Sequence, residues 1–131
     1  MAGSRGVKAR RDREVSRFES KSEIDETLRR AISMEVAFKD ASLDRLETDA
    51  SFKAGFGNAV VKAYRKRMQQ IRAATDERTF YAHRSFHFEK LQGDREGQYS
   101  MRLNDQWRLI IELHGESPRK TVHVIEIVDY H

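Results

Sequence analysis

The chain has 131 residues, a net charge of +4 and 35% charged side chains, so it has room for one small domain with a largely ionic surface. The absence of cysteine excludes disulfides, thiolate metal sites and thiol nucleophiles, and it suits a reducing cytoplasm. No apolar run approaches the roughly 18 residues of a membrane span, and the basic N-terminus has no apolar segment behind it, so neither a membrane helix nor a signal peptide is predicted.

Residues 1–33 show little apolar pattern, and we interpret them as a disordered or weakly helical extension. The spacing of Ile24, Leu28 and Ile32 indicates one short helix with a narrow apolar stripe. A complete domain pattern begins only afterwards, so the predicted boundary separates this extension from a domain over 34–131. A genuine N-terminal arm and a start codon assigned too early both explain this division.

The first half of the domain predicts one strand and two helices. Residues 34–38 alternate apolar and polar side chains, as a half-buried strand does. Residues 41–48 follow a capping Asp40 and predict a short helix, and two glycines then precede a longer helix over 58–74. The apolar stripe of this longer helix consists of Val60, Val61, Tyr64, Met68 and Ile71.

The second half of the domain predicts a three-stranded meander after residues 75–98, which show no clear period. Alternation with intervening turns indicates strands over 99–103, 107–113 and 122–127. In the last strand, the side chains expected on one face are those of Val122, Val124 and Glu126. Apolar residues on both faces favour central positions for the last two strands.

The resulting order of strand, helix, helix and three strands predicts an α+β domain with its helices on one face of an antiparallel sheet. The opposite face is then open to a ligand, and it carries Ser100, Arg102 and Arg108.

Acid–base chemistry in this chain must come from histidines and carboxylates. Asp129 and His131 follow a predicted strand at i and i+2, where extended side chains share a face, and an imidazole can transfer protons near neutral pH. The same three residues also fit a frayed chain end without function, so the pattern alone leaves a catalytic site and a frayed end both open. His83 and His87 stand four residues apart without an evident third ligand, and no metal site is predicted.

A basic stretch from Lys62 to Arg108 holds eleven lysines and arginines against six acidic residues, which attracts phosphate backbones but also describes an ordinary solvated surface. Cleavage of RNA needs proton transfer at the 2′-hydroxyl and at the leaving oxygen, positive charge around the phosphorane, and a stacking surface. The candidates for these roles are Asp129 and His131 for proton transfer, Arg95, Lys90, Arg102 and Arg108 for charge, and Tyr130 for stacking. This chemistry requires no metal ion or other cofactor.

Three sequence segments carry a family resemblance: Leu91–Ser100 (LQGDREGQYS), Asn104–Leu109 (NDQWRL) and the closing Asp129–His131 (DYH). In this order and spacing they resemble the HigB branch of the RelE-like toxins of bacterial toxin–antitoxin systems, over residues 34–131. The resemblance implies a compact βααβββ fold and a cytoplasmic, ribosome-dependent mRNA endoribonuclease (an mRNA interferase). It also implies a cognate antitoxin, often a HigA-like helix-turn-helix protein.

By the same resemblance, Asp129, Tyr130 and His131 match the C-terminal active-site residues of the family, and Arg108 and Arg95 match its strand and loop arginines. Two positions depart from the family pattern, since Gln92 replaces a common lysine and Glu89 replaces a frequent histidine. Lys90 and His87 are candidates to substitute for them. The departures also motivate an alternative, a non-catalytic binding module on the same fold, such as a decayed toxin or a gyrase-type inhibitor.

Overall fold

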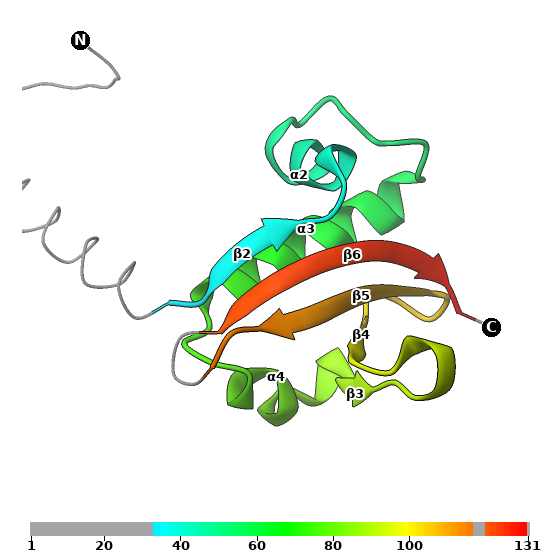
Figure 1. Ribbon diagram of the computed structural model, residues 1–131. Coiled ribbons are helices and arrows are strands. Elements are labelled where there is room, and N and C mark those ends of the chain that lie inside the picture. The colour runs from blue at the N-terminus through cyan, green and yellow to red at the C-terminus, as the bar shows by residue number, and fades with distance from the viewer. Residues whose placement is uncertain (1–32, 117–119, 131) are drawn as a thin grey trace, which may run out of the picture. The chain divides into compact units, whose positions relative to one another are not determined.

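The computed structural model describes residues 33–116 and 120–130, and within them a five-stranded mixed sheet carries the fold. Its order is β2-β6-β5-β4-β3 (Figure 1). Strands β4, β5 and β6 form the expected antiparallel meander, and β2 pairs with β6 in parallel. The strands are β2 (Glu35–Phe38), β3 (Glu89–Lys90), β4 (Gln98–Arg102), β5 (Trp107–His114) and β6 (Thr121–Asp129).

Helices α2 (Ala41–Thr48) and α3 (Asn58–Ala73) confirm the two predicted helices. Asp40 caps α2 as predicted, because its side chain accepts a hydrogen bond from the Ser42 amide at 2.9 Å. The structure adds short elements within the interval that showed no period. These are α4 (Arg78–Ala82), η1 (Arg84–Phe86), strand β3 and, in the loop before β4, η2 (Gly93–Arg95).

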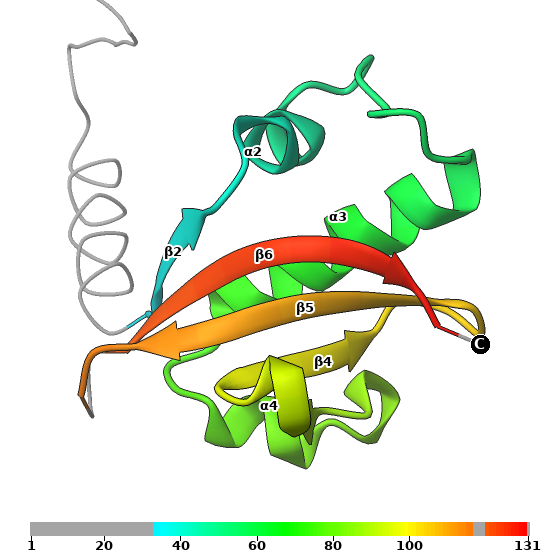
Figure 2. The ribbon, with the colours of Figure 1, turned by 45° about the vertical axis from the view of Figure 1, so that its right-hand side comes forward.

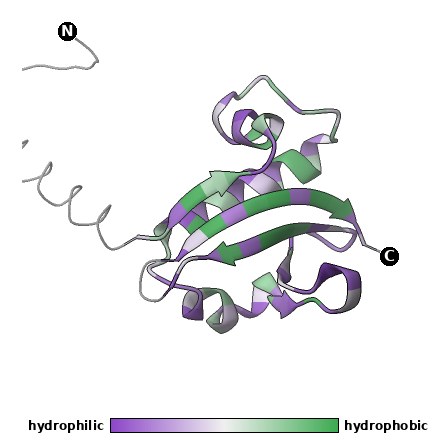
Figure 3. Ribbon diagram, viewed as in Figure 1, coloured by the Kyte–Doolittle hydropathy of each residue, from purple (hydrophilic) through white to green (hydrophobic). Residues whose placement is uncertain are grey.

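Helix α3 crosses one face of the sheet and supplies most of the helical side of the core (Figures 1 and 2). All five predicted stripe residues of this helix are buried. In Figure 3, hydrophobic colour dominates β5 and β6, with polar bands between, as expected for central strands. The sheet side of the core consists of Val36, Phe38, Tyr99, Met101, Leu103, Trp107, Leu109, Ile111, Leu113, Val122, Val124 and Ile127.

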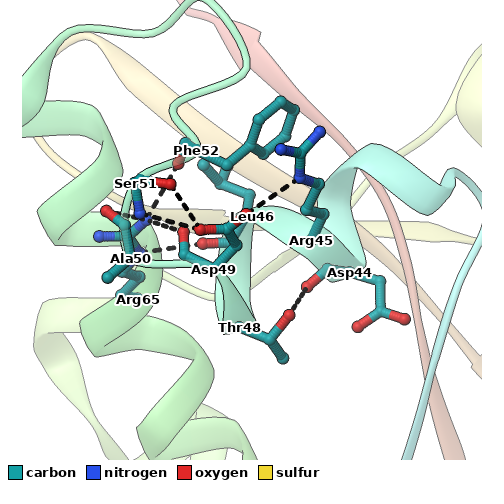
Figure 4. A network of polar contacts seen from close by, with 9 residues as sticks. All are labelled: Asp44, Arg45, Leu46, Thr48, Asp49, Ala50, Ser51, Phe52 and Arg65. Atoms are coloured by element: carbon teal, nitrogen blue, oxygen red, sulfur yellow. Dashed lines mark hydrogen bonds and ion pairs between the residues drawn. The ribbon is translucent and has the colours of Figure 1, made fainter.

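The segment after α2 is fastened to α3 by one arginine (Figure 4). Nε of Arg65 donates to the carbonyl of Leu46 at 2.9 Å, and Nη2 donates to the carbonyl of Asp49 at 2.9 Å and to that of Phe52 at 3.0 Å. The last carbonyls of a helix lack partners within the helix, so a side chain that reaches them terminates α2 and fixes the chain beyond it.

A second arginine of α3 is buried rather than solvated. Arg67 is 8% exposed, its Nε and Nη2 donate to the carbonyl of Arg102 at 3.1 and 2.6 Å, and its guanidinium lies 4.3 Å from the Phe86 ring centroid. Desolvation lowers the pKa of Arg67, and the nearby charge of Arg102 adds to this effect. The contact joins α3 to the end of β4, directly before the turn into β5.

A bulge in β6 decides which residues reach the face of the sheet opposite the core. Ile110 pairs with Glu126 while Ile111 pairs with Val124, so Ile125 is an extra residue in β6. The prediction that Glu126 shares a face with Val122 and Val124 is therefore wrong, since strict alternation stops at the bulge.

Beyond the bulge, side chains of β6 change sides relative to the predicted pattern. We call the side of the sheet opposite the core the open face. Strand register places on it Gln98, Ser100, Arg102, Arg108, Ile110, Glu112, His114, His123, Glu126 and Val128. Tyr130 follows Val128 by two residues, and the bulge thus brings it to the open face. Within residues 33–116 and 120–130, no helix is long and apolar enough to cross a membrane.

Candidate functional site

Arg108 is the centre of the candidate site. It lies on β5, opposite Arg102 of β4, and both side chains stand on the open face. Nη1 of Arg108 donates to Ser100 Oγ at 3.2 Å and to the carbonyl of His87 at 3.1 Å. His87 ends η1 and has a left-handed backbone (φ 43°), which is uncommon for a residue other than glycine. The carbonyl of this same residue accepts the hydrogen bond from Arg108.

The aromatic partner of Arg108 comes from the end of β6. The guanidinium carbon of Arg108 lies 4.8 Å from the ring centroid of Tyr130, within the range of a cation–π contact. Tyr130 is 48% exposed, so its ring is available to a ligand. Its amide donates to the carbonyl of Gln106 at 2.6 Å, which fixes Tyr130 beside the turn between β4 and β5. Figure 2 shows the end of β6 close to the start of β5.

Asp129 lies at the same end of the sheet as Tyr130, but its side chain is on the core side of the sheet. Its register partner is Trp107, and its Oδ2 accepts a hydrogen bond from Gln106 Nε2 at 3.0 Å. Asp129 and Tyr130 therefore lie on opposite sides of the sheet. His131, the predicted partner of Asp129, lies outside the described residues, so their joint action stays a prediction.

The other predicted cationic residues lie at different distances from this centre. Arg102 is adjacent to Arg108 and forms an ion pair with Asp105 in the following turn. Arg95 reaches across the sheet from η2, where it forms a 2.5 Å ion pair with Glu126 of β6 and donates to Gln98 Oε1 at 2.7 Å. Arg95 therefore lies on the open face, with both acidic and amide partners.

The edge strand β3 holds Glu89, one of the two departures from the family pattern, and Lys90, one of the suggested substitutes. Glu89 pairs with Ser100, so it shares the open face with the contact between Ser100 and Arg108. Lys90 pairs with Tyr99, a core-side residue, and its side chain leaves the strand on the other side. Gln92 precedes η2 and is exposed. Of the two suggested substitutes, His87 thus lies beside Arg108 and Lys90 points away from it.

Two polar features were not predicted from the sequence: Gln106 in the turn between β4 and β5, and a group of three side chains on β5 and β6. Gln106 holds both Asp129 and Tyr130, and only the pairing of β5 with β6 shows this. Glu112, His114 and His123 also converge, with one potential ligand atom from each lying within 4.8 Å of the others. Glu112 and His114 alternate on one strand, which is visible in the sequence, but the approach of His123 depends on strand register.

A family model described as the RelE-like toxin of type II toxin–antitoxin system HigB matches residues 36–131, nearly the whole described domain. The chain belongs to this HigB-like toxin family. The match includes all the candidate residues named above, from Lys90 to His131. No curated protein sequence matches the chain.

Solved structures agree with this assignment at the level of the fold. The YoeB/ParE toxin from Agrobacterium tumefaciens is 22% identical, with a TM-score of 0.50 over 75% of this HigB-like chain and 100% of that protein. A YoeB dimer structure from Staphylococcus aureus is 15% identical, with a TM-score of 0.38 over 75% of this chain and 97% of the other. The first of these supports a shared fold, and the second is too distant to add to it.

Proposed function

We propose that this HigB-like toxin is an mRNA endoribonuclease that cleaves messages on the ribosome and thereby inhibits translation. The observation that carries the proposal is the contact between Arg108 and Tyr130. Arg108 forms no ion pair within the described part of the chain, and its polar contacts are a hydroxyl, a carbonyl and an aromatic face. A guanidinium without a carboxylate, opposite a second arginine, favours an anionic ligand such as a phosphate.

The aromatic ring beside that cation supports RNA as the ligand. An exposed tyrosine offers a stacking surface for an unpaired base, and the neighbouring arginine can bind the adjoining phosphate. Both side chains are held by backbone elements, Arg108 by the central strand β5 and Tyr130 through the Gln106 carbonyl. Such preorganisation favours one orientation of the RNA backbone.

The proposed reaction uses the ribose itself as the nucleophile and needs no metal. The 2′-oxygen loses its proton and attacks the adjacent phosphorus, the bond to the 5′-oxygen breaks, and that oxygen gains a proton. We assign the proton transfers to His131, with Asp129 orienting it or sharing the transfers, and charge stabilisation of the phosphorane to Arg108. Arg102 and Arg95 contribute phosphate binding, and Lys90 contributes longer-range attraction.

Membership of a type II toxin family implies a cognate antitoxin. We propose that this partner is a HigA-like helix-turn-helix protein and that the pair operates in the cytoplasm. A toxin that acts on the ribosome also needs little basic surface of its own, which agrees with ion pairs such as that of Arg95 with Glu126 on the open face.

The test is to express the toxin from a tightly controlled promoter and to map the 5′ ends of cellular mRNA within minutes of induction. We expect new ends inside translated codons of a reporter message, and none in the same message without a functional start codon. Arg108→Ala should reduce cleavage by about 10²- to 10³-fold, the usual effect of removing one charge-stabilising group at a transition state. His131→Ala should abolish it.

The matched control is Arg45→Ala. This arginine lies on α2, outside the sheet, where it pairs with Asp49, and its loss should leave cleavage unchanged. Equal cleavage by His131→Ala and the wild type would show that the proton-transfer assignment is wrong. If induction arrests growth without new 5′ ends while translation continues, the toxin acts as a binding module, the alternative suggested by Gln92 and Glu89.

A further inference from the structure

Two histidines and a glutamate meet on the open face, away from Arg108. Glu112 and His114 project from the same side of β5, and His123 of β6 is the register partner of Glu112. His114 Nε2 lies 2.7 Å from Glu112 Oε1, and the ring centroids of the two histidines are 4.8 Å apart. Arg108 precedes Glu112 by four residues on an extended strand, so roughly 13 Å separates the two sites.

The three side chains match the donor set of a transition-metal site. Imidazole nitrogen with one carboxylate oxygen suits Zn²⁺, Ni²⁺ and Cu²⁺. Their potential ligand atoms all lie within 4.8 Å of one another. Ligands of a tetrahedral zinc ion lie about 3.3 Å apart at the usual bond lengths, so small side-chain rotations bring these three to that spacing.

His123 distinguishes this cluster from an ordinary surface ion pair, because one of its imidazole nitrogens is buried. Nδ1 of His123 is buried and has no hydrogen-bond partner in the described part of the chain. Buried polar atoms are nearly always satisfied, so an unpartnered nitrogen on a residue of this cluster favours a ligand for it. Coordination of a metal by Nδ1 would satisfy it.

Neighbouring side chains orient Glu112 by hydrogen bonds, as outer-shell residues orient the ligands of a metal site. Gln98 Nε2 donates to Glu112 Oε2 at 3.0 Å, which leaves Oε1 directed toward His114. Gln98 is itself held by Arg95 at 2.7 Å, so a chain of side chains orients the carboxylate. Such support of a ligating carboxylate is typical of metal sites. The side chains of His114 and Glu112 are 50% and 30% exposed, so an ion can reach them.

We propose that His114 Nε2, His123 Nδ1 and Glu112 Oε1 bind one divalent transition-metal ion of the Zn²⁺ class. Three protein ligands leave a coordination position that faces the solvent over the open face, where water or an anionic oxygen can bind. The proposal does not depend on ribonuclease activity, because it concerns residues outside the group around Arg108 and is tested by binding alone.

The test is equilibrium dialysis of the full-length, tag-free chain against Zn²⁺, with the bound metal measured by mass spectrometry. We expect one ion per chain at micromolar Zn²⁺. His114→Ala and His123→Gln should each weaken binding by more than about 100-fold, beyond the 10- to 100-fold effect typical of outer-shell changes, and Gln98→Met should fall within that range. Co²⁺ bound to the wild type should show visible absorption that His123→Gln removes.

His83→Ala is the matched control, since this exposed histidine lies beside Phe86 and outside the cluster, and it should bind Zn²⁺ as the wild type does. Because His114 is half exposed, its replacement should leave the fold intact, which circular dichroism would check. Absence of stoichiometric binding, or binding that survives both histidine replacements, would overturn the proposal.

Discussion

At the scale of single residues, Tyr64 shows how this small core accommodates a polar atom. Its ring is fully buried on α3, and its hydroxyl donates to the carbonyl of Leu43 in α2 at 2.8 Å. Burial raises the pKa of Tyr64 well above the usual range, and the carboxylates of Glu47 and Asp44 add to the shift. The folded state thus requires the neutral phenol.

Replacement of Tyr64 by Phe should lower the free energy of unfolding by about 1 kcal/mol at neutral pH, because the hydrogen bond to Leu43 is lost. Folding raises the pKa of the Tyr64 phenol, and this shift stabilises the folded state fully below the pKa of an unfolded tyrosine, about 10. The stabilisation is lost as the pH rises through the pKa of Tyr64 in the folded state. Thermal unfolding of the wild type should therefore show a fall in Tm above pH 10, and Tyr64→Phe should flatten it.

The exposed Tyr130 supplies the control for this experiment, since Tyr130→Phe should leave the alkaline fall in Tm in place. An alkaline fall that persists unchanged in Tyr64→Phe would assign it to other groups.

Single residues also show what the sequence could not predict about the site. Arg108 and Tyr130 were both candidates, but their contact joins two strands through a bulge at Ile125, and no periodicity within one strand predicts a bulge. The same holds for His123 beside Glu112, which depends on register. The burial of Arg67 was also not predicted, since its hydrogen bond to the Arg102 carbonyl joins α3 to a distant strand.

At the scale of elements, the prediction succeeded wherever an element was long enough to show its period. Helices α2 and α3 and strands β4 to β6 each repeat an apolar spacing, and their residue ranges agree with the structure within a few positions. Strand β3 has two residues, both exposed, and α4 has five, so neither completes a recognisable pattern. The parallel pairing of β2 with β6 joins distant segments and has no local sequence signal.

The element most dependent on a single side chain is the segment between α2 and α3. Arg65→Lys should lower the free energy of unfolding by about 1–3 kcal/mol, because one ammonium cannot replace a planar guanidinium that reaches the carbonyls of Leu46, Asp49 and Phe52 together. Urea denaturation followed by circular dichroism would measure the change.

Arg45→Lys is the comparison for this variant, since Arg45 is exposed, pairs with Asp49 and contacts the same segment from α2. It should leave the urea midpoint close to that of the wild type. Equal destabilisation by both replacements would mean that positive charge near Asp49, rather than the geometry of the Arg65 contacts, stabilises the segment.

At the scale of the whole molecule, the boundary between the N-terminal extension and the domain over 34–131 stays a prediction. Residues 33–131 form one compact unit, and the family model matches from residue 36. We predict that a chain starting at Met34 unfolds at the same urea concentration as the full chain and cleaves mRNA with the same pattern. Weaker ribosome association of the shortened chain, measured by co-sedimentation, would instead show that residues 1–33 contribute to binding.

The topology has a consequence for the order of synthesis. Strand β6 lies between β2 and β5, although it follows every other strand in the sequence, and it leads directly to Asp129 and Tyr130. While β6 is still inside the exit tunnel of the ribosome that makes it, β2 has no strand to pair with and Arg108 lacks its aromatic neighbour. The pairing of β2 and the contact between Arg108 and Tyr130 therefore form only once β6 is available, so both depend on the strand of the sheet that is made last among those described.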